Sequence, residues 1–291
     1  MQPTHGRTTL GSLLRSFEGG SGMANGSARS GRTRVRTLFL SDTHLGYRHA
    51  RARELNEFLA GVEAESIVLV GDIVDALSLS RRMFWSAEHT QVVRTLLARG
   101  RAGTRLVYIP GNHDESLGVF AEMLQGQFAV HREWVHRTAR GERLLVLHGD
   151  QFDGGVGCSP WLTQLGDRLY ELTVRVSDGV NNLRRALGKA YWPLAERLKL
   201  SIPTSVRYIE KYERVAADHA RTQGYDGVVC GHIHRANLRH IEGTLYCNTG
   251  DWVESCSALI ETAGGELKLL RWPHAASAPR RRTAGLIADA A

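Results

Sequence analysis

The sequence lacks any apolar run near the ~20 residues that a membrane-spanning helix requires. Its N-terminal region scatters a few leucines among Gly, Ser and Thr, so we predict no secretory signal. Cysteine is scarce too, and none of the four residues shows a CxxC spacing. We therefore expect reduced, buried thiols and a cytoplasmic protein rather than a disulfide framework.

An evenly spread positive charge is missing as well. The formal net charge is +7, which alone would favour a nucleic-acid partner. Residues 1–36 carry +5 of this charge and residues 271–291 carry +3, which leaves −1 for residues 37–270. We therefore expect no nucleic-acid partner.

The 42% of hydrophobic residues is ordinary for a globular protein and supports a sizeable core.

Apolar strands alternate with amphipathic helices in the first half of the chain. Strands are predicted over 35–40, 67–70 and 106–109, and helices over 51–63 and 88–99. This alternation is typical of βαβ units, whose functional loops gather at the carboxyl ends of the strands. The predicted fold class is therefore α/β.

The β pattern pauses after residue 150 and resumes after residue 224. A hairpin is predicted over 130–147, strands follow at 228–230 and 244–247, and a second hairpin covers 258–272. Between them, leucines and valines recur every three or four residues from Leu162 to Leu187, which predicts a long amphipathic helix in an inserted cap. The predicted boundaries are a disordered tail at 1–33, a core at 34–150 and 225–272, a cap at 151–224 and a disordered tail at 273–291.

Five short polar motifs end or follow predicted strands. They are Asp42-x-His44, Gly71-Asp72-x-x-Asp75, Gly111-Asn112-His113-Asp114, His148-Gly149-Asp150 and Gly231-His232-x-His234. Any one of them is common by chance, but five at strand ends predict a single metal site. Carboxylate and amide oxygens mixed with imidazoles suit Mn²⁺, Fe or Zn²⁺ better than Ca²⁺. Two adjacent ions need a shared ligand, for which the carboxylate of Asp72 is the candidate.

This motif set, over residues 42–234, resembles that of the calcineurin-like metallophosphoesterases. The resemblance implies a four-layered α/β/β/α sandwich with an inserted helical cap and two divalent metal ions at its rim. Mn²⁺ is the metal that we expect, ahead of Fe or Zn²⁺. It also implies a ligand set in which Asp72 bridges the two ions. The first ion would take Asp42, His44 and His234, and the second would take Asn112, His148 and His232.

The same resemblance assigns roles beyond the ligands. His113 resembles the family's catalytic imidazole, which stabilises the phosphate or protonates the leaving oxygen, and Asp114 is expected to orient it. Asp75 and Asp150 are expected to support ligands from behind. The implied reaction is hydrolysis of a phosphoester or pyrophosphate bond.

The chain is more similar to one branch, the UDP-2,3-diacylglucosamine hydrolases of lipid A synthesis. That branch shares the His-Gly-Asp turn, a helical insertion and the approximate length. It implies a lipid-linked nucleotide sugar as substrate, UMP and lipid 1-phosphate as products, and peripheral contact with the inner face of the membrane through the cap. One departure is that the best-known members carry Arg where this chain has His113.

Two other functions stay open at this point. The same chemistry on another substrate would make the chain a phosphoesterase for a phosphoprotein, a cyclic nucleotide or a nucleic-acid end. A non-catalytic interaction module on this fold would be recognised by missing ligands, and none of the seven is missing. The turn at residues 248–251 either lines the site or only closes a hairpin.

Overall fold

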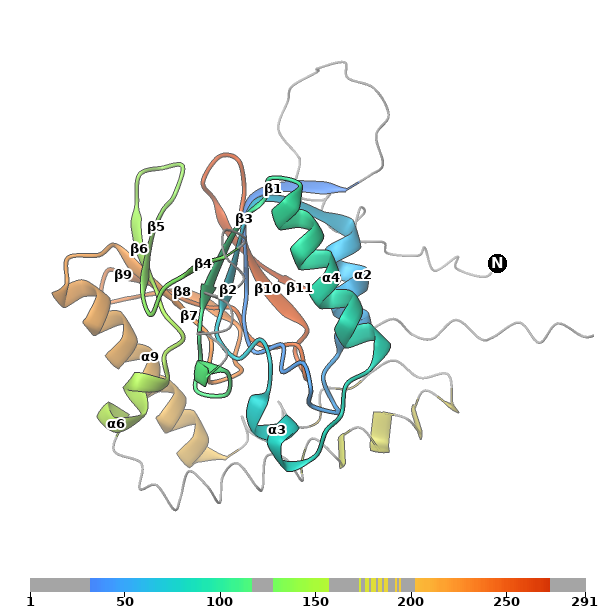
Figure 1. Cartoon of the computed structure of the whole chain (residues 1–291). Coiled ribbons are helices and arrows are strands. Elements are labelled where there is room, and N and C mark those ends of the chain that lie inside the picture. The colour runs from blue at the N-terminus through green and yellow to red at the C-terminus, as the bar shows by residue number, and fades with distance from the viewer. Residues whose placement is uncertain are drawn as a thin grey trace, which may run out of the picture.

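The computed structural model describes residues 32–116, 128–156 and 202–272, with scattered residues between 173 and 194. The predicted tails lie almost wholly outside these residues, and so does most of the helix predicted over 162–187. Within the described part, two β-sheets and their flanking helices form the molecule (Figure 1). The predicted α/β class is confirmed.

The first sheet carries the N-terminal βαβ units. Its strand order is β11-β10-β1-β2-β3-β4, and β1, β2, β3 and β4 run parallel to one another. The bounds are β1 Thr33–Leu40, β2 Val62–Val70, β3 Arg105–Ile109, β4 Ala129–Val130, β10 Ser257–Glu261 and β11 Leu267–Arg271. The strands β10 and β11 form the predicted C-terminal hairpin, which adds to the sheet antiparallel to β1.

The second sheet has the order β5-β6-β7-β9-β8, and its three central strands are parallel. The bounds are β5 Trp134–Arg137, β6 Arg143–Val146, β7 Gly227–Cys230, β8 Asn237–Ile241 and β9 Thr244–Asn248. The strands β5 and β6 form the predicted first hairpin. The strand β8 was not predicted from the sequence, and it pairs antiparallel with β9 at the edge of the sheet.

Helices cover the outer faces of the two sheets. The helices α2 (Ala52–Gly61) and α4 (Ala87–Arg101) pack on the first sheet, with Leu55, Phe58 and Val92 in the same buried cluster as the strands. A separate buried cluster lies between the two sheets, where Phe39 and Val107 of the first sheet pack with Val229 of the second. The two sheets therefore share one apolar interior, and Figure 1 shows them side by side between helices.

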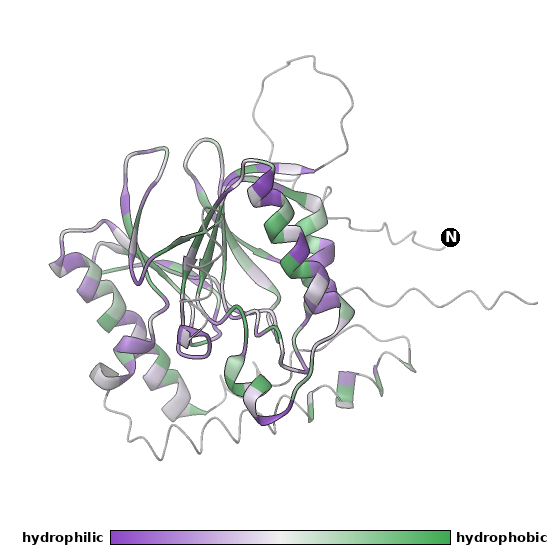
Figure 2. Cartoon of the chain, viewed as in Figure 1, coloured by the Kyte–Doolittle hydropathy of each residue, from purple (hydrophilic) through white to green (hydrophobic). Residues whose placement is uncertain are grey.

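The second sheet is covered by α9 (Pro203–Thr222), which differs from the predicted domain boundary. Its residues Tyr212 and Ala216 are fully buried against Val228 and Tyr246. The predicted cap at 151–224 included this helix, but the buried face of residues 203–222 packs on the second sheet. Hydropathy colouring shows α9 with green positions alternating with purple ones (Figure 2).

Three short helices border the sheets at the ends of strands. They are α3 (Ala76–Arg81), the 3-10 turn η1 (Asp150–Phe152) and α6 (Asp153–Val156). The strand β2 begins at Val62, earlier than predicted, because α2 passes directly into it. Among the described residues no helix combines the length and apolar character needed to cross a membrane.

Candidate metal centre

The parallel registers bring the five motifs to one rim of the molecule. In the first sheet Leu40 pairs with Leu69, and Val70 pairs with Ile109, so β1, β2 and β3 end at the same level. In the second sheet Val146 pairs with Val229, which aligns the ends of β6 and β7. Each motif follows one of these ends, and side chains distant in the chain therefore converge there.

Backbone hydrogen bonds join the first two motifs beyond the sheet itself. The amide of Asp42 donates to the carbonyl of Gly71 over 3.0 Å, and the amide of His44 donates to the carbonyl of Asp72 over 3.0 Å. One step further, Leu45 forms a parallel bridge with Val74. These bonds continue the parallel pairing of β1 and β2 into the loops that carry the predicted ligands.

Left-handed backbone conformations concentrate on the predicted ligands. Seven non-glycine residues in the described part of the chain have positive φ. Five of these seven are predicted ligands: Asp42, His44, Asp72, His232 and His234. Such conformations cost about 1–3 kcal/mol each and cluster at functional sites. The fold maintains this strain at the convergence of the motifs, which indicates a functional centre there.

The glycines of three motifs are required by close approach. A Cβ on Gly71 would collide with the ring of His148, and one on Gly111 would collide with Asp72. A Cβ on Gly231 would collide with the carboxylate of Asp42. Each of these glycines thus makes room for a predicted ligand from another motif, so the motifs are packed directly against one another.

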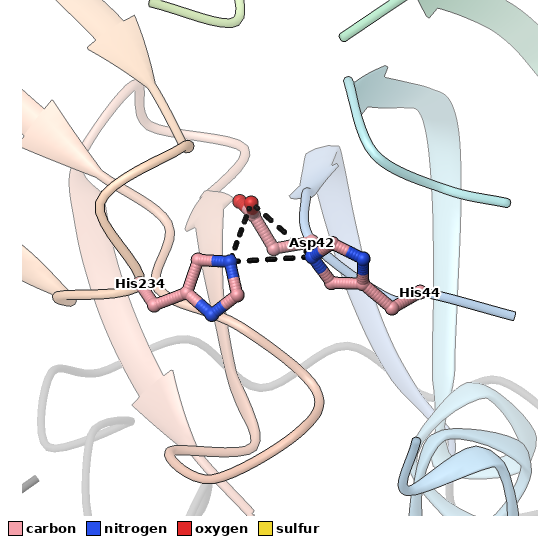
Figure 3. A group of neighbouring side chains, drawn as sticks. All are labelled: Asp42, His44 and His234. Carbon is pink, nitrogen blue, oxygen red and sulfur yellow. Dashed lines mark hydrogen bonds and ion pairs between the residues drawn. The ribbon is translucent and has the colours of Figure 1, made fainter. Parts of the chain in front are cut away.

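Asp42, His44 and His234 form the first group of ligand atoms (Figure 3). The Nε2 atoms of His44 and His234 face each other at 3.2 Å, and Nε2 of His234 lies 3.2 Å from Oδ1 of Asp42. Two imidazole nitrogens and a carboxylate oxygen that face one another need a proton or a cation between them. Figure 3 shows the three side chains pointing toward one another from two different regions of the ribbon.

Asp72 links this group to His148. Its Oδ2 lies 3.4 Å from Nε2 of His148 and 3.8 Å from Nε2 of His44. The other nitrogen of His148, Nδ1, donates to the carbonyl of Val70 over 2.9 Å, which directs Nε2 into the site. A ligating histidine usually has its second ring nitrogen bonded in this way.

The donor set fits divalent metal ions. Three overlapping groups of ligand atoms, each within 4.8 Å, involve Asp42, His44, Asp72, His148 and His234, with His113 as a sixth member. Oδ1 of Asp42 and Nε2 of His148 are also buried without a hydrogen-bond partner, although each lies near an ionisable neighbour. Buried polar atoms are rarely left in this state. A cation would satisfy both.

The charges of the cluster show the same demand for a cation. Burial lowers the pKa of His148, but the charge of Asp72 and the contact with it raise that pKa to about 10. Burial likewise lowers the pKa of His44, whereas hydrogen bonding to Asp75 and the charge of Asp72 raise it to about 9. Without metal the imidazoles hold protons beside the carboxylates. Divalent ions would replace those protons.

His113 is hydrogen-bonded by Asp75. Its Nδ1 lies 3.1 Å from Oδ1 of Asp75, and the other oxygen of that carboxylate lies 3.3 Å from Nδ1 of His44. The His113 side chain is 31% exposed, more than any of the imidazoles around it. Asp75 therefore orients two imidazoles at once.

Asp114 has a different role from the one the sequence predicted. Its carboxylate accepts from the amides of Gly111 (2.6 Å), Ile73 (2.7 Å) and Asp72 (3.2 Å). Burial and the nearby charge of Asp72 raise the pKa of this carboxyl. Asp114 ties the turn after β3 to the turn after β2, and the contact with His113 belongs to Asp75 instead.

The structure leaves two predicted ligands apart from the cluster. Asn112 is exposed at the turn after β3 and has no hydrogen bond to another predicted ligand in the described residues. His232 lies beside His148, with ring centroids 5.2 Å apart, but its Nε2 lies 3.0 Å from both oxygens of Asp153. Only Nδ1 of His232 is left to meet an ion.

Asp153 was not predicted from the sequence, which pointed to Asp150 in its place. Asp153 accepts from the hydroxyl of Tyr208 on α9 over 2.7 Å and contacts His232 with the same carboxylate. Burial raises the pKa of Asp153, but hydrogen bonding to His232 holds it below its usual value. Asp150 opens η1 and is half-buried. The spacing that could have pointed to Asp153 is an Asp three residues after the His-Gly-Asp turn.

The turn at 248–251 packs behind Asp42. The hydroxyl of Ser41 donates to the carboxylate of Asp42 and also contacts the hydroxyl of Thr249. The side-chain amide of Asn248 donates to the carbonyl of Gly231 over 2.6 Å, just before His232. This turn supports the ligand loops and does more than close a hairpin.

Comparison with known proteins agrees with this geometry. The model of the family described as calcineurin-like phosphoesterase matches residues 35–236. A UDP-2,3-diacylglucosamine hydrolase of Neisseria meningitidis (serogroup C, serotype 2a) is 22% identical over 251 residues, covering 78% of this chain and 93% of that protein. The enzyme of the same name from Neisseria gonorrhoeae is 22% identical over 252 residues, covering 78% and 94%.

Among solved structures, a novel archaeal phosphodiesterase is similar to the chain. It is 12% identical, with 81% of this chain and 98% of that chain covered and a TM-score of 0.41. A likeness at this level carries no argument about function, which depends on the family match and on the geometry of the site.

Proposed function

The chain belongs to the calcineurin-like phosphoesterases and is a hydrolase; from this premise we propose that it cleaves a phosphoester or pyrophosphate bond with two divalent metal ions. The observation that carries the proposal is the convergence of three overlapping ligand groups at one rim of the sheets. Two of their atoms, Oδ1 of Asp42 and Nε2 of His148, are buried without a hydrogen-bond partner, and bound ions would satisfy both.

The proposed ligand sets rest on the contacts between the predicted side chains. One ion would take Asp42, His44 and His234, and Asp72 would be shared, because it contacts both the His44 side and the His148 side. The second ion would take His148, with the two remaining predicted ligands, Asn112 and Nδ1 of His232, turning to it. Oxygen and imidazole donors without sulfur favour Mn²⁺, with Fe or Zn²⁺ as alternatives. When bound, two such ions offset the charge of a phosphate and ionise water near neutral pH.

His113 is proposed to act on the substrate directly. Its Nδ1–H donates to Asp75, which leaves Nε2 as the atom that can donate a proton to the leaving oxygen. The carboxylate of Asp75 fixes the orientation of the His113 ring for this step. Burial opposes ionisation of Asp75, but its hydrogen bonds with His113 and His44 lower its pKa, so it is ionised at neutral pH.

Asp153 and Tyr208 are proposed to position His232. The carboxylate fixes Nε2 of the ring, and the phenol of Tyr208 in turn fixes the carboxylate from α9. In the same helix the hydroxyl of Tyr212 donates to the carbonyl of Gly149, next to His148. The helix α9 thus contacts the segment from Gly149 to Asp153 at two points, and Asp153 extends this support to His232.

The proposed substrate is a lipid-linked nucleotide sugar of the UDP-2,3-diacylglucosamine type, cleaved to UMP and lipid 1-phosphate. The Neisseria relatives carry that name and align over 93–94% of their length, which supports this choice. A second candidate is a phosphoester without a lipid. It is favoured by His113, which stands where the best-known members of that branch have Arg.

The test compares Mn²⁺-activated turnover of three substrates: UDP-2,3-diacylglucosamine, bis(p-nitrophenyl) phosphate and p-nitrophenyl phosphate. If the nucleotide sugar is the substrate, its kcat/KM exceeds that of both chromogenic esters by about 100-fold or more, because remote groups contribute binding energy to the reaction. Comparable values would favour the second candidate. A protein that holds two ions and hydrolyses none of the three would contradict the phosphoesterase proposal.

A further inference from the structure

A segment beside the metal centre exposes large apolar side chains that the fold does not use. Within residues 77–85, Leu77 is 44% exposed, Trp85 39% and Met83 78%. The other exposed large apolar side chains of the described chain all belong to the insertion or its end: Val176, Leu183, Leu187 and Ile202. We call residues 77–85 the rim loop.

The rim loop is continuous with the metal centre. Its helix α3 begins directly after Asp75, the carboxylate that contacts His44 and His113. The amide of Ala76 donates to the carbonyl of His113 over 3.1 Å. In Figure 1, α3 projects from the end of the sheets that carries the motifs, away from the β5–β6 turn at the opposite end.

The rim loop is held in place, so its exposure does not come from loose packing. The indole of Trp85 donates to Oγ1 of Thr90 over 3.0 Å, and its ring lies 5.3 Å from that of His89. The ring of Phe84 lies 5.6 Å from the same imidazole, which is buried at the start of α4. Met83 is carried outward by this support and is mostly exposed to solvent.

The charge of the segment is one-sided. Residues 76–86 contain Arg81 and Arg82, both exposed, and no acidic residue, whereas residues 37–270 as a whole carry −1. A third arginine, Arg48, places its guanidinium 5.8 Å from the centre of the Phe84 ring. The nearest carboxylates in the sequence are Asp75, which is buried, and Glu88, which is exposed in the first turn of α4. Exposed apolar and indole side chains beside arginines are typical of segments that lie in a membrane interface.

We propose that the rim loop docks the protein on an anionic lipid surface. Met83 and Leu77 would enter the boundary between headgroups and acyl chains, Trp85 would lie at headgroup level, and the two arginines would pair with lipid phosphates. Docking in this way would turn the metal centre toward the bilayer. The consequence for a lipid-linked substrate rests on the proposed function, whereas the docking itself does not.

The experiment measures co-sedimentation of the full chain with two kinds of vesicle, one of phosphatidylcholine alone and one of an equal mixture with phosphatidylglycerol. The test variants are Met83→Ser and the double variant Arg81→Gln/Arg82→Gln. The control is Arg94→Gln/Arg101→Gln, which removes the same charge from exposed positions on α4. None of these residues belongs to the metal centre, so turnover of bis(p-nitrophenyl) phosphate serves as a check that every variant is folded.

The wild-type chain should bind the anionic vesicles and bind phosphatidylcholine weakly. The rim-loop arginine pair should lower the partition coefficient about 25-fold, since each arginine near such a surface contributes about fivefold. Met83→Ser should lower it about tenfold, and the control pair should change it far less than the rim-loop pair.

Equal binding to both vesicles, or equal losses in the test and control pairs, would overturn the proposal. A concentration-dependent dimer in sedimentation velocity that Met83→Ser abolishes would assign the loop to a second copy of the chain instead. Loss of turnover on all substrates by the wild-type chain would contradict the proposed function and leave the docking result unaffected, so the two failures can be told apart.

Discussion

Replacing Asp75 with Asn tests how one carboxylate serves two imidazoles. Its Oδ1 accepts from the amide of Ser78 over 2.7 Å and lies 3.1 Å from Nδ1 of His113. Its Oδ2 accepts from the hydroxyl of Ser78 over 2.8 Å and lies 3.3 Å from Nδ1 of His44. Asparagine caps helices about as well as aspartate, so its oxygen should stay in the Oδ1 position at the start of α3. The amide NH₂ then faces His44.

The two imidazoles should respond differently to Asp75→Asn. His44 loses its acceptor, and loss of such an outer partner lowers metal affinity by about 10–100-fold. His113 keeps a hydrogen bond, but to a neutral oxygen. Charged and neutral hydrogen bonds differ by about 1 kcal/mol, so kcat at saturating Mn²⁺ should fall about fivefold. In Asp75→Ala both contacts vanish, and kcat should fall about 10–150-fold.

The assay is turnover of bis(p-nitrophenyl) phosphate as a function of Mn²⁺ concentration, which separates metal affinity from kcat. Ser78→Ala is the matched control, because it removes a donor to the same carboxylate and leaves both imidazole contacts in place. It should preserve the Mn²⁺ affinity and kcat within about twofold. If Asp75→Asn shifts neither quantity more than Ser78→Ala does, the assignment of Asp75 as the partner of both imidazoles is refuted.

Three further results are expected. Asp72→Asn should retain fewer than two ions per chain in metal analysis, and retention of both would exclude a shared ligand. Because the pKa values of His44 and His148 are raised to about 9 and about 10, both are protonated in the metal-free protein at pH 7 and must release protons on binding. Mn²⁺ affinity should therefore rise with pH, about tenfold per unit for each displaced proton, and calorimetry that shows no dependence on buffer ionisation heat would contradict this. Glu261→Gln should cost about 3–5 kcal/mol in urea unfolding, since this fully buried carboxylate contacts His136 at 2.7 Å. Burial raises the pKa of Glu261, but the hydrogen bond to His136 lowers it to about 2. The stabilisation by this carboxylate is therefore present above pH 4.5 and is lost as the pH falls toward 2. The same urea midpoint in the wild-type chain and the variant would refute the stabilising role of Glu261.

The candidate metal centre could be predicted from the sequence because strand ends are local signals. An apolar run that stops at Gly71-Asp72 or at Gly111-Asn112 shows both where a strand ends and which polar groups come next. Parallel pairing then places such ends at one rim without further information. The α/β class and the phosphoesterase family were within reach for this reason.

Partners across the site could not be predicted, because they depend on the third dimension. Asp114 follows His113 in the chain and was expected to orient it, but its carboxylate accepts amides from the neighbouring turn instead. Asp153 was overlooked since its contacts, with His232 and Tyr208, lie 79 and 55 residues away. Sequence proximity suggested Asp150, and only packing distinguishes the two carboxylates.

Helix α9 shows the limit of periodicity. An apolar face recurring every three or four residues says that a helix packs against something, without saying what. The face of α9 formed by Tyr212 and Ala216 packs on the second sheet, although the helix lies within the range predicted as a cap. The positive φ values at Asp42, Asp72 and the histidines also have no signature in the sequence, because residues other than glycine rarely adopt them.

Anomalous diffraction from crystals of the full chain grown with Mn²⁺ tests the shared-ligand centre most directly. We predict two manganese peaks at the rim, one bound by Asp42, His44 and His234, the other bound by His148, with the carboxylate of Asp72 in contact with both. A single peak, or two peaks without Asp72 between them, would contradict the centre on which the proposed hydrolysis depends.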